Sequence, residues 1–168
     1  YAEGTIPSRA KPNADYGFST VTWTGNGTDG ATVAHGLSQT PEMIIIKKRA
    51  NNSGGNTGNW ITQHVGLSTT PEATSSTFTL SGYTNGAIYL NLNMAQSSYG
   101  FDDQVNGNTD TFVAYCFHSV DGYQKLGSYT GTGSSGNSIT GLGFRPAFLM
   151  VKRTDTAADW VILDSFRN

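Results

Sequence analysis

The sequence predicts an all-β fold, a β-sandwich of jelly-roll type built from two repeated antiparallel β units. One observation is the composition: 21 of 168 residues are glycine and only 13% are charged, whereas 11% are aromatic. Glycine, Thr, Ser and Asn fill the polar positions, and these residues favour turns and pleated surfaces over helix interiors. The other observations are short alternating strand patterns between glycine-rich turns and an internal repeat.

The repeat relates residues 17–64 to residues 122–165. Its matching pieces are Gly17–Gly25 with Gly122–Gly131, Pro41 with Pro146, Met43–Lys48 with Phe148–Arg153, and Trp60-Ile61 with Trp160-Val161. Because glycines, prolines and apolar positions keep their order, each copy is expected to form a similar β unit. Residues 1–16 are interpreted as an N-terminal linker or extension and residues 17–168 as the sandwich domain.

Each copy has the pattern of β-strands. Val21 and Trp23 alternate with threonines, which is typical of a half-buried strand, and Met43–Ile46 form an apolar run expected in a central strand whose Lys-Lys-Arg end leads out to solvent. Further strands are predicted between the copies at Thr77–Leu80, Ala87–Leu92 and Thr111–Phe117, and Asn-Gly pairs at 26–27, 85–86 and 106–107 predict hairpins. The side chains expected to be mostly buried are Ile44, Ile46, Val113, Tyr115, Leu149 and Val151.

The second copy is shorter than the first. About 50 residues follow the Trp60 strand before the repeat begins again, whereas Asn168 comes soon after the Trp160 strand. Two explanations are open: the two copies share one set of intervening strands, or strands from beyond residue 168 complete the second copy.

Composition and motifs argue against several functional classes. A net charge of −2 with no long basic run disfavours a nucleic-acid partner, and no stretch approaches the 18 apolar residues of a membrane span. His35, His64 and His118 have no metal-ligand spacing, Cys116 lies in an apolar strand, and no nucleophile elbow or phosphate-binding loop occurs. We therefore expect no enzymatic activity, no cofactor and no membrane association.

Two weaker sites remain. Asp102, Asp103 and Asp110 form an acidic, Asn-rich loop that offers oxygen ligands for Ca²⁺, although the favoured interpretation is a solvated turn. Glycan binding needs exposed aromatic rings, and Tyr83, Tyr89 and Tyr99 between the copies are the better candidates for this role. Trp60 and Trp160 occupy the same repeat position, which favours packing over ligand binding.

Several segments together resemble a domain of unknown function that recurs in tail-fibre and other virion proteins of marine bacteriophages. They are Gly17-Phe-Ser-Thr-Val-Thr-Trp-Thr-Gly-Asn-Gly27, Val33-Ala-His-Gly-Leu37, Pro41-Glu-Met-Ile-Ile-Ile-Lys-Lys-Arg49, Phe112-Val-Ala-Tyr-Cys-Phe117, Gly127-Ser-Tyr-Thr-Gly131, Gly143-Phe-Arg-Pro-Ala-Phe-Leu-Met-Val-Lys-Arg153 and Asp159-Trp160. The resemblance implies a β-rich component of an extracellular phage particle and supplies no catalytic residue.

Two functions are consistent with these expectations. The first is a virion structural module of a tail fibre, tail or capsid decoration, which contacts copies of itself and neighbouring virion proteins. The alternative is a module that binds a host-surface glycan during attachment. A neutral surface rich in Thr, Ser and Asn suits either protein or glycan contacts.

Overall fold

The computed structural model describes residues 3–28, 30–52, 60–67, 77–80, 87–89, 95–96, 105–156 and 158–167. Of the strands at 77–80, 87–89 and 95–96 only the backbone is described. The elements in chain order are β1 (Ser8–Asn13), a 3-10 turn η1 (Ala14–Tyr16), β2 (Phe18–Thr24), β3 (Ala31–Ala34), β4 (Met43–Ala50), β5 (Trp60–His64), β6 (Thr77–Leu80), β7 (Ala87–Tyr89), β8 (Ala95–Gln96), β9 (Thr111–Phe117), β10 (Phe148–Lys152) and β11 (Trp160–Asp164).

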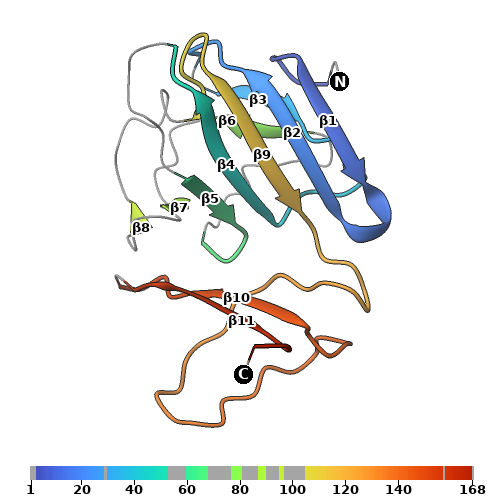
Figure 1. Ribbon diagram of the computed structural model, residues 1–168, viewed down its shortest axis with the longest axis vertical. Coiled ribbons are helices and arrows are strands. Elements are labelled where there is room, and N and C mark those ends of the chain that lie inside the picture. Colours follow the sequence, from blue (N-terminus) through green and yellow to red (C-terminus); the bar gives the residue numbers. More distant parts are fainter. Residues whose placement is uncertain are drawn as a thin grey trace.

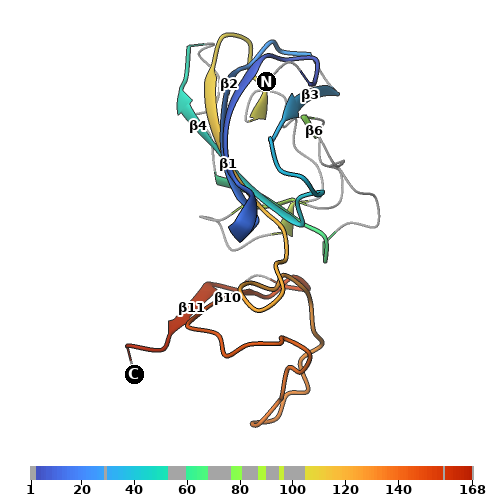
Figure 2. The same cartoon turned by 90° about the vertical axis from the view of Figure 1, so that its right-hand side faces the viewer.

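A large antiparallel sheet dominates the architecture and confirms the all-β, sandwich-like prediction. Its strand order is β1-β2-β9-β4-β5-β7-β8, so β9 lies between β2 and β4 although it follows β4 by about 60 residues of chain (Figure 1). A β3-β6 pair forms a second, smaller layer on one side of this sheet (Figure 2). Within the described residues, no helix has the length and apolar character needed to cross a membrane.

The core lies between the two layers, and strand alternation decides which side chains enter it. On β4, Ile44 and Ile46 are buried and Ile45 is only half-buried, as expected for a central strand with one core face. On β9 the buried side chains are Phe112, Ala114 and Cys116. Val113 and Tyr115, which are expected to be mostly buried, point to the other face of the sheet and are half-buried there, so they lie outside the core.

The smaller layer covers the core with apolar side chains of β3 and the loop after it. Ala31, Val33 and Leu37 are buried against the large sheet, and the Ser19 hydroxyl donates a hydrogen bond to the His35 carbonyl oxygen at 2.5 Å. That bond joins β2 to the end of the β3 layer, so the two layers are linked by polar as well as apolar contacts.

The N-terminal residues contribute to the sheet. All six residues of β1 pair antiparallel with β2, and Ile6 is buried in the core beside a parallel bridge to Val33. An extended segment placed next to β2 satisfies backbone groups that β2 would otherwise expose at the sheet edge. The segment interpreted as a linker or extension thus includes the edge strand of the sheet.

The repeated segments form two hairpins with the same register. In the first hairpin Met43 lies opposite His64 and Lys47 opposite Trp60. In the second hairpin the equivalent residues are paired in the same way, with Phe148 opposite Asp164 and Lys152 opposite Trp160. The sequence repeat therefore corresponds to a structural repeat of the β4–β5 hairpin.

The surroundings of the two hairpins differ. The β4–β5 hairpin lies inside the large sheet, whereas β10 and β11 pair only with each other among the described strands and lie apart from it (Figure 1). The expected burial of Leu149 was wrong, because no second layer of described residues covers this hairpin and the side chain is 39% exposed. Val151 is half-buried. Residues 127–147 contain no strand, although part of this segment is the counterpart of β2.

Two of the Asn-Gly pairs do not form tight hairpins. The pair at 26–27 lies in the loop that carries the chain from β2 to β3 in the other layer, and the pair at 106–107 precedes β9. These loops bond to each other, since the Gly27 N–H donates to the Asn106 carbonyl oxygen at 2.8 Å. The pair at 85–86 lies outside the described residues.

Truncation of β4 side chains should distinguish its two faces. We expect Ile46→Ala to lower the free energy of unfolding by about 2–5 kcal/mol, because Ile46 is 1% exposed and its removal leaves a cavity. The matched change Ile45→Ala, on the half-buried face, should cost clearly less. Urea unfolding followed by tryptophan fluorescence would measure both, and equal losses would contradict the assignment of the faces.

Candidate functional site

The residues proposed from the sequence as sites are only partly described. Tyr83, Tyr99, Asp102 and Asp103 lie outside the described residues, and for Tyr89 only the backbone in β7 is described. Asp110 is described and fully buried at the start of β9, so it does not belong to a solvated turn. Among the described residues, no group of three or more His, Cys, Asp or Glu side chains is placed to hold a metal ion.

Asp110 forms a buried ion pair with Lys48 of β4. The Lys48 Nζ lies 2.7 Å from Asp110 Oδ2, and the two side chains are 1% and 0% exposed. The other carboxylate oxygen, Oδ1, accepts a hydrogen bond from the Asn52 backbone N–H at 2.6 Å. Both oxygens of Asp110 are thus engaged within the protein, which is what a buried charge requires.

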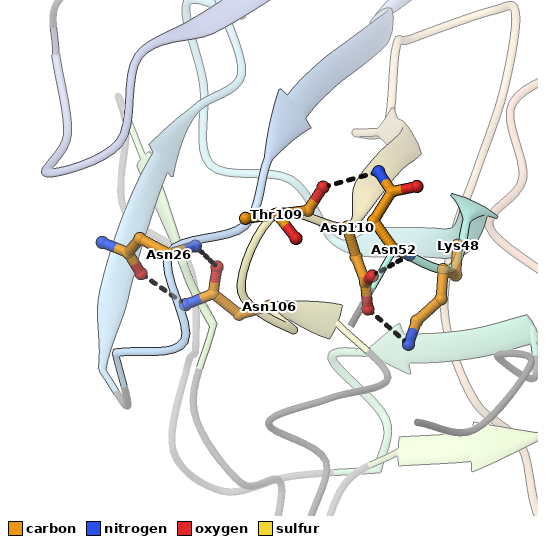
Figure 3. Close-up of polar contacts among 6 residues, drawn as sticks. All are labelled: Asn26, Lys48, Asn52, Asn106, Thr109 and Asp110. Atoms are coloured by element: carbon orange, nitrogen blue, oxygen red, sulfur yellow. Dashed lines mark hydrogen bonds and ion pairs between the residues drawn. The ribbon is translucent and has the colours of Figure 1, made fainter. Parts of the chain in front are cut away.

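Backbone and amide groups extend this pair into a loop network (Figure 3). The Asn52 side chain donates to the Thr109 carbonyl oxygen at 2.9 Å, and the Asn106 side chain donates to Asn26 Oδ1 at 2.9 Å. Asn106 Oδ1 in turn accepts from the Asn26 backbone N–H at 3.1 Å. Three loops, after β2, after β4 and before β9, are therefore fastened together at one end of the sheet.

A glycine makes the close approach of two of these loops possible. A Cβ atom at Gly25 would overlap the Gly107 carbonyl oxygen, so any other residue there would force the loops apart. The Gly25 N–H donates to the Asp110 carbonyl oxygen at 2.8 Å, and the Thr109 N–H donates to the Gly25 carbonyl oxygen at 3.0 Å. This arrangement holds the start of β9 against the end of β2.

The position of Lys48 corrects the expectation that the Lys-Lys-Arg end of this strand leads to solvent. Lys48 lies two residues after Ile46 and four after Ile44, and alternate residues of a strand share one face, so Lys48 points to the core. The strand alternation contained this signal, although the charge of the side chain obscured it. A register shift of the β4–β9 pairing between Lys48 and Ala50 lets the exposed Arg49 bulge out.

The three histidines take part in local backbone bonds. His35 Nδ1 accepts from the Leu37 N–H at 3.0 Å, and His64 Nδ1 accepts from the Gly66 N–H at 2.9 Å. Burial lowers the pKa of His64, an effect that the nearby Glu42 partly opposes, so this imidazole is neutral at pH 7. His118 Nδ1 lies 2.8 Å from the Ser119 carbonyl oxygen.

Cys116 is a core side chain in this structure. It is completely buried on the inner face of β9, and burial raises the pKa of its thiol far above the ordinary value. A thiol that remains protonated is a poor nucleophile, and Cys116 therefore packs as a small apolar residue.

The β10–β11 hairpin presents the most unusual surface among the described residues. Its exposed side chains are Phe148 at 60%, Leu149 at 39%, Val161 at 48%, Ile162 at 52% and Leu163 at 55%. Phe166, just after β11, is 92% exposed. Leu149, Val161 and Leu163 share one face of the hairpin, whereas Phe148 and Ile162 lie on the other, so both faces expose apolar side chains.

Comparison with known proteins gives a family. The profile of the family described as "Domain of unknown function (DUF7483)" matches residues 1–168. The chain belongs to this family. No curated protein and no solved structure matched the chain, so the DUF7483 assignment carries no activity or ligand with it.

Removal of one partner of the buried ion pair should destabilise this DUF7483 domain strongly. We expect Lys48→Met to lower the free energy of unfolding by about 3–5 kcal/mol, because the Asp110 carboxylate would remain buried without its counter-ion. Adding Asp110→Asn should recover at least half of the loss, since the amide still offers an acceptor to the Asn52 N–H.

Arg49→Met is the matched control, because Arg49 is the exposed neighbour of Lys48. It should change stability by less than about 0.5 kcal/mol. Urea unfolding of the four proteins would measure these differences, and a double variant no more stable than Lys48→Met would contradict the role given to the uncompensated charge.

Proposed function

We propose that this domain is a structural module of a bacteriophage particle, in a tail fibre, tail or capsid decoration, and that it acts through protein–protein assembly. The proposal assigns it no catalytic activity and places it in the extracellular virion, among copies of itself and neighbouring virion proteins. The resemblance of its repeated segments to a domain of phage virion proteins supports the biological setting.

The exposed apolar hairpin is the observation that carries this proposal. Positions that are buried in the first hairpin, such as Ile44 and Ile61 at 1% exposure each, correspond to Leu149 and Val161, which are 39% and 48% exposed. Exposed apolar area of this kind is stabilised when another protein surface covers it. An assembly would bury in the second hairpin what the sandwich buries in the first.

The low charge of the surface is consistent with an assembly role. Proteins that remain monomeric usually protect exposed strand edges with Lys, Pro or inward-pointing charges. The chain has only ten Lys and Arg residues, and four of them, Lys48, Lys152, Arg153 and Arg167, are engaged in ion pairs or hydrogen bonds within the chain. The number of cations that could protect strand edges is therefore small.

Self-association of the isolated chain tests this function. We expect sedimentation velocity to show species larger than a monomer that grow with concentration between about 10 and 200 μM, a range typical of weak apolar interfaces. The double change Ile162→Lys with Leu163→Lys should restore a monomer, because it places one charge on each apolar face of the hairpin. Ser138→Lys, at an exposed polar position, is the control and should leave association unchanged. A parent chain that stays monomeric throughout would count against assembly through its own copies.

The alternative function, binding of a host-surface glycan, has one observation in its favour. Tyr16 and Tyr123 are 49% and 54% exposed, and their ring centroids lie 4.6 Å apart at an interplanar angle of 48°. Exposed aromatic rings near loop ends are the groups on which sugar rings stack. The Gln124 side chain lies beside them and donates to the Tyr16 carbonyl oxygen at 3.1 Å.

A glycan array would separate this alternative from assembly. If the domain binds surface glycans through this pair, Tyr123→Ala should lower the signal at least about tenfold, as loss of a stacking platform does in other ligand sites. Tyr129→Ala, at an exposed tyrosine of the second copy, is the matched control. Absence of any array signal, or equal signals from both variants, would remove the Tyr16–Tyr123 pair as a glycan site.

A further inference from the structure

We propose that the β10–β11 unit is an acceptor for one added β-strand of the β9 type, donated by another polypeptide chain and lying antiparallel to β10. This inference rests on the proposed assembly function and names the contact through which assembly occurs. Four differences between the two copies of the repeat carry it: three concern contacts of β9 or of Asp110 directly before it, and one concerns the exposure of the core face of the hairpin.

The first difference is the neighbour of the hairpin. In the first copy, β9 pairs antiparallel with β4 over its whole length, with Met43 opposite Phe117, Ile44 opposite Cys116 and Ile46 opposite Ala114. In the second copy, β10 has the equivalent sequence and the same pairing to its hairpin partner, but the edge that corresponds to the β9 side has no strand among those described. An unpaired edge of this kind accepts an added strand through its free backbone groups.

The second difference is the exposure of the core face. Ile44, Ile46 and Ile61 face the core in the first copy and are 1% exposed each. By register their counterparts are Leu149, Val151 and Val161, and the fourth member of that face, Leu163, is 55% exposed. The second hairpin thus keeps an apolar core face without the elements that cover it in the first copy.

The third difference concerns the segment equivalent to β2. In the first copy β2 is held by β9, and Trp23 stacks on Phe112 of β9 with ring centroids 5.3 Å apart. The residue that matches Trp23 in the repeat is Tyr129, which is 53% exposed in a segment without strand structure. In the sheet, β9 lies between β2 and β4 and pairs with both. One strand that is absent from the second copy would therefore account both for the lack of strand structure in the β2 counterpart and for the unpaired edge of β10.

The fourth difference is a cation without its buried partner. Lys48 of the first copy forms the buried ion pair with Asp110, one residue before β9. Its counterpart Arg153 is 60% exposed and forms an ion pair within its own loop, to Asp155 at 2.5 Å. A strand that enters as β9 does would bring a carboxylate to the place where Arg153 lies, so the acceptor and the strand are complementary in charge.

The chain's own β9 cannot occupy both copies. One of its edges pairs with β2 and the other with β4, and Phe112, Ala114 and Cys116 are all fully buried in the first core. A strand has two hydrogen-bonding edges, and both are occupied, so the two copies do not share β9. The proposal takes the donor strand from another polypeptide chain in the assembly.

The contacts of β9 define the chemistry of the donor strand. It is about seven residues long, with small side chains opposite Leu149 and Val151, as Cys116 and Ala114 stand opposite Ile44 and Ile46. An aromatic residue precedes them, as Phe112 does, and an acidic residue stands two positions before that aromatic residue, as Asp110 does. This pattern is an extended apolar strand with a carboxylate at its start.

A synthetic peptide with the sequence of residues 108–118, carrying Cys116→Ala to prevent oxidation, tests the inference on the full 168-residue protein. We expect saturable binding by isothermal calorimetry, and hydrogen exchange should show new protection in β10 and in residues 127–131 but none in β1. Leu149→Lys, on the core face of β10, should weaken the peptide's binding at least about tenfold, because the added strand would lie beside β10 with its equivalent of Cys116 opposite position 149. Leu163→Lys, on the same face but on β11 and therefore one strand further from the added strand, is the control and should change affinity by less than about threefold.

The charge complementarity has its own test. The peptide change Asp110→Asn and the protein change Arg153→Gln should each weaken binding, and the double combination should be no weaker than the worse single one, as expected for two groups that contact each other. Lack of saturable binding, equal effects of the two lysine variants, or protection at the β1 edge would overturn the inference. If the parent chain self-associates but does not bind the peptide, the inference of a β9-type donor strand is wrong, whereas the proposed assembly function still stands. Peptide binding by a chain that is otherwise monomeric would support the acceptor and count against assembly through whole copies.

Discussion

The fold depends on one strand that arrives late in the chain and pairs on both edges. β9 joins β2 to β4, and without it these two strands of the first copy would not belong to one sheet. Alternate residues of β9 point into the core. Phe112 stacks there on Trp23, and the smaller Ala114 and Cys116 leave room for the β3 layer. Pairing between such distant segments costs loop entropy, and the buried apolar area offsets that cost.

The polar network at the start of β9 fixes how the strand enters the sheet. A buried ion pair adds little net stability compared with apolar packing, but it strongly disfavours arrangements in which one charge is left alone. Lys48 can satisfy its charge only when Asp110 is at the correct end of β9, and the asparagine pair Asn26–Asn106 joins the flanking loops at the same end. The network therefore selects the register of β9 between its neighbours, while the apolar face stabilises the sheet.

The internal duplication places two related hairpins, β4–β5 and β10–β11, in different surroundings within one molecule. Both copies encode a hairpin, and both hairpins have the same register, so this part of the fold is determined within each copy. Burial differs between the copies: the core face of β4 and β5 is covered by the β3 layer of the first copy together with Ile6 and Phe112, whereas Leu149 and Leu163 on the same face of the second hairpin are exposed. The same hairpin therefore has a closed core face in the first copy and an exposed one in the second.

The sequence by itself determined the fold class, the duplication and the positions of most described strands. Thr111–Phe117 was predicted with the bounds that the structure shows, since glycine-bounded runs of β-branched and aromatic residues are local signals. The sequence did not determine the partners of β9, the inward direction of Lys48, or the loss of strand structure in the β2 counterpart. Those features depend on which distant segments meet at a sheet edge, and a period of two assigns side chains to two faces without saying which face another layer will cover.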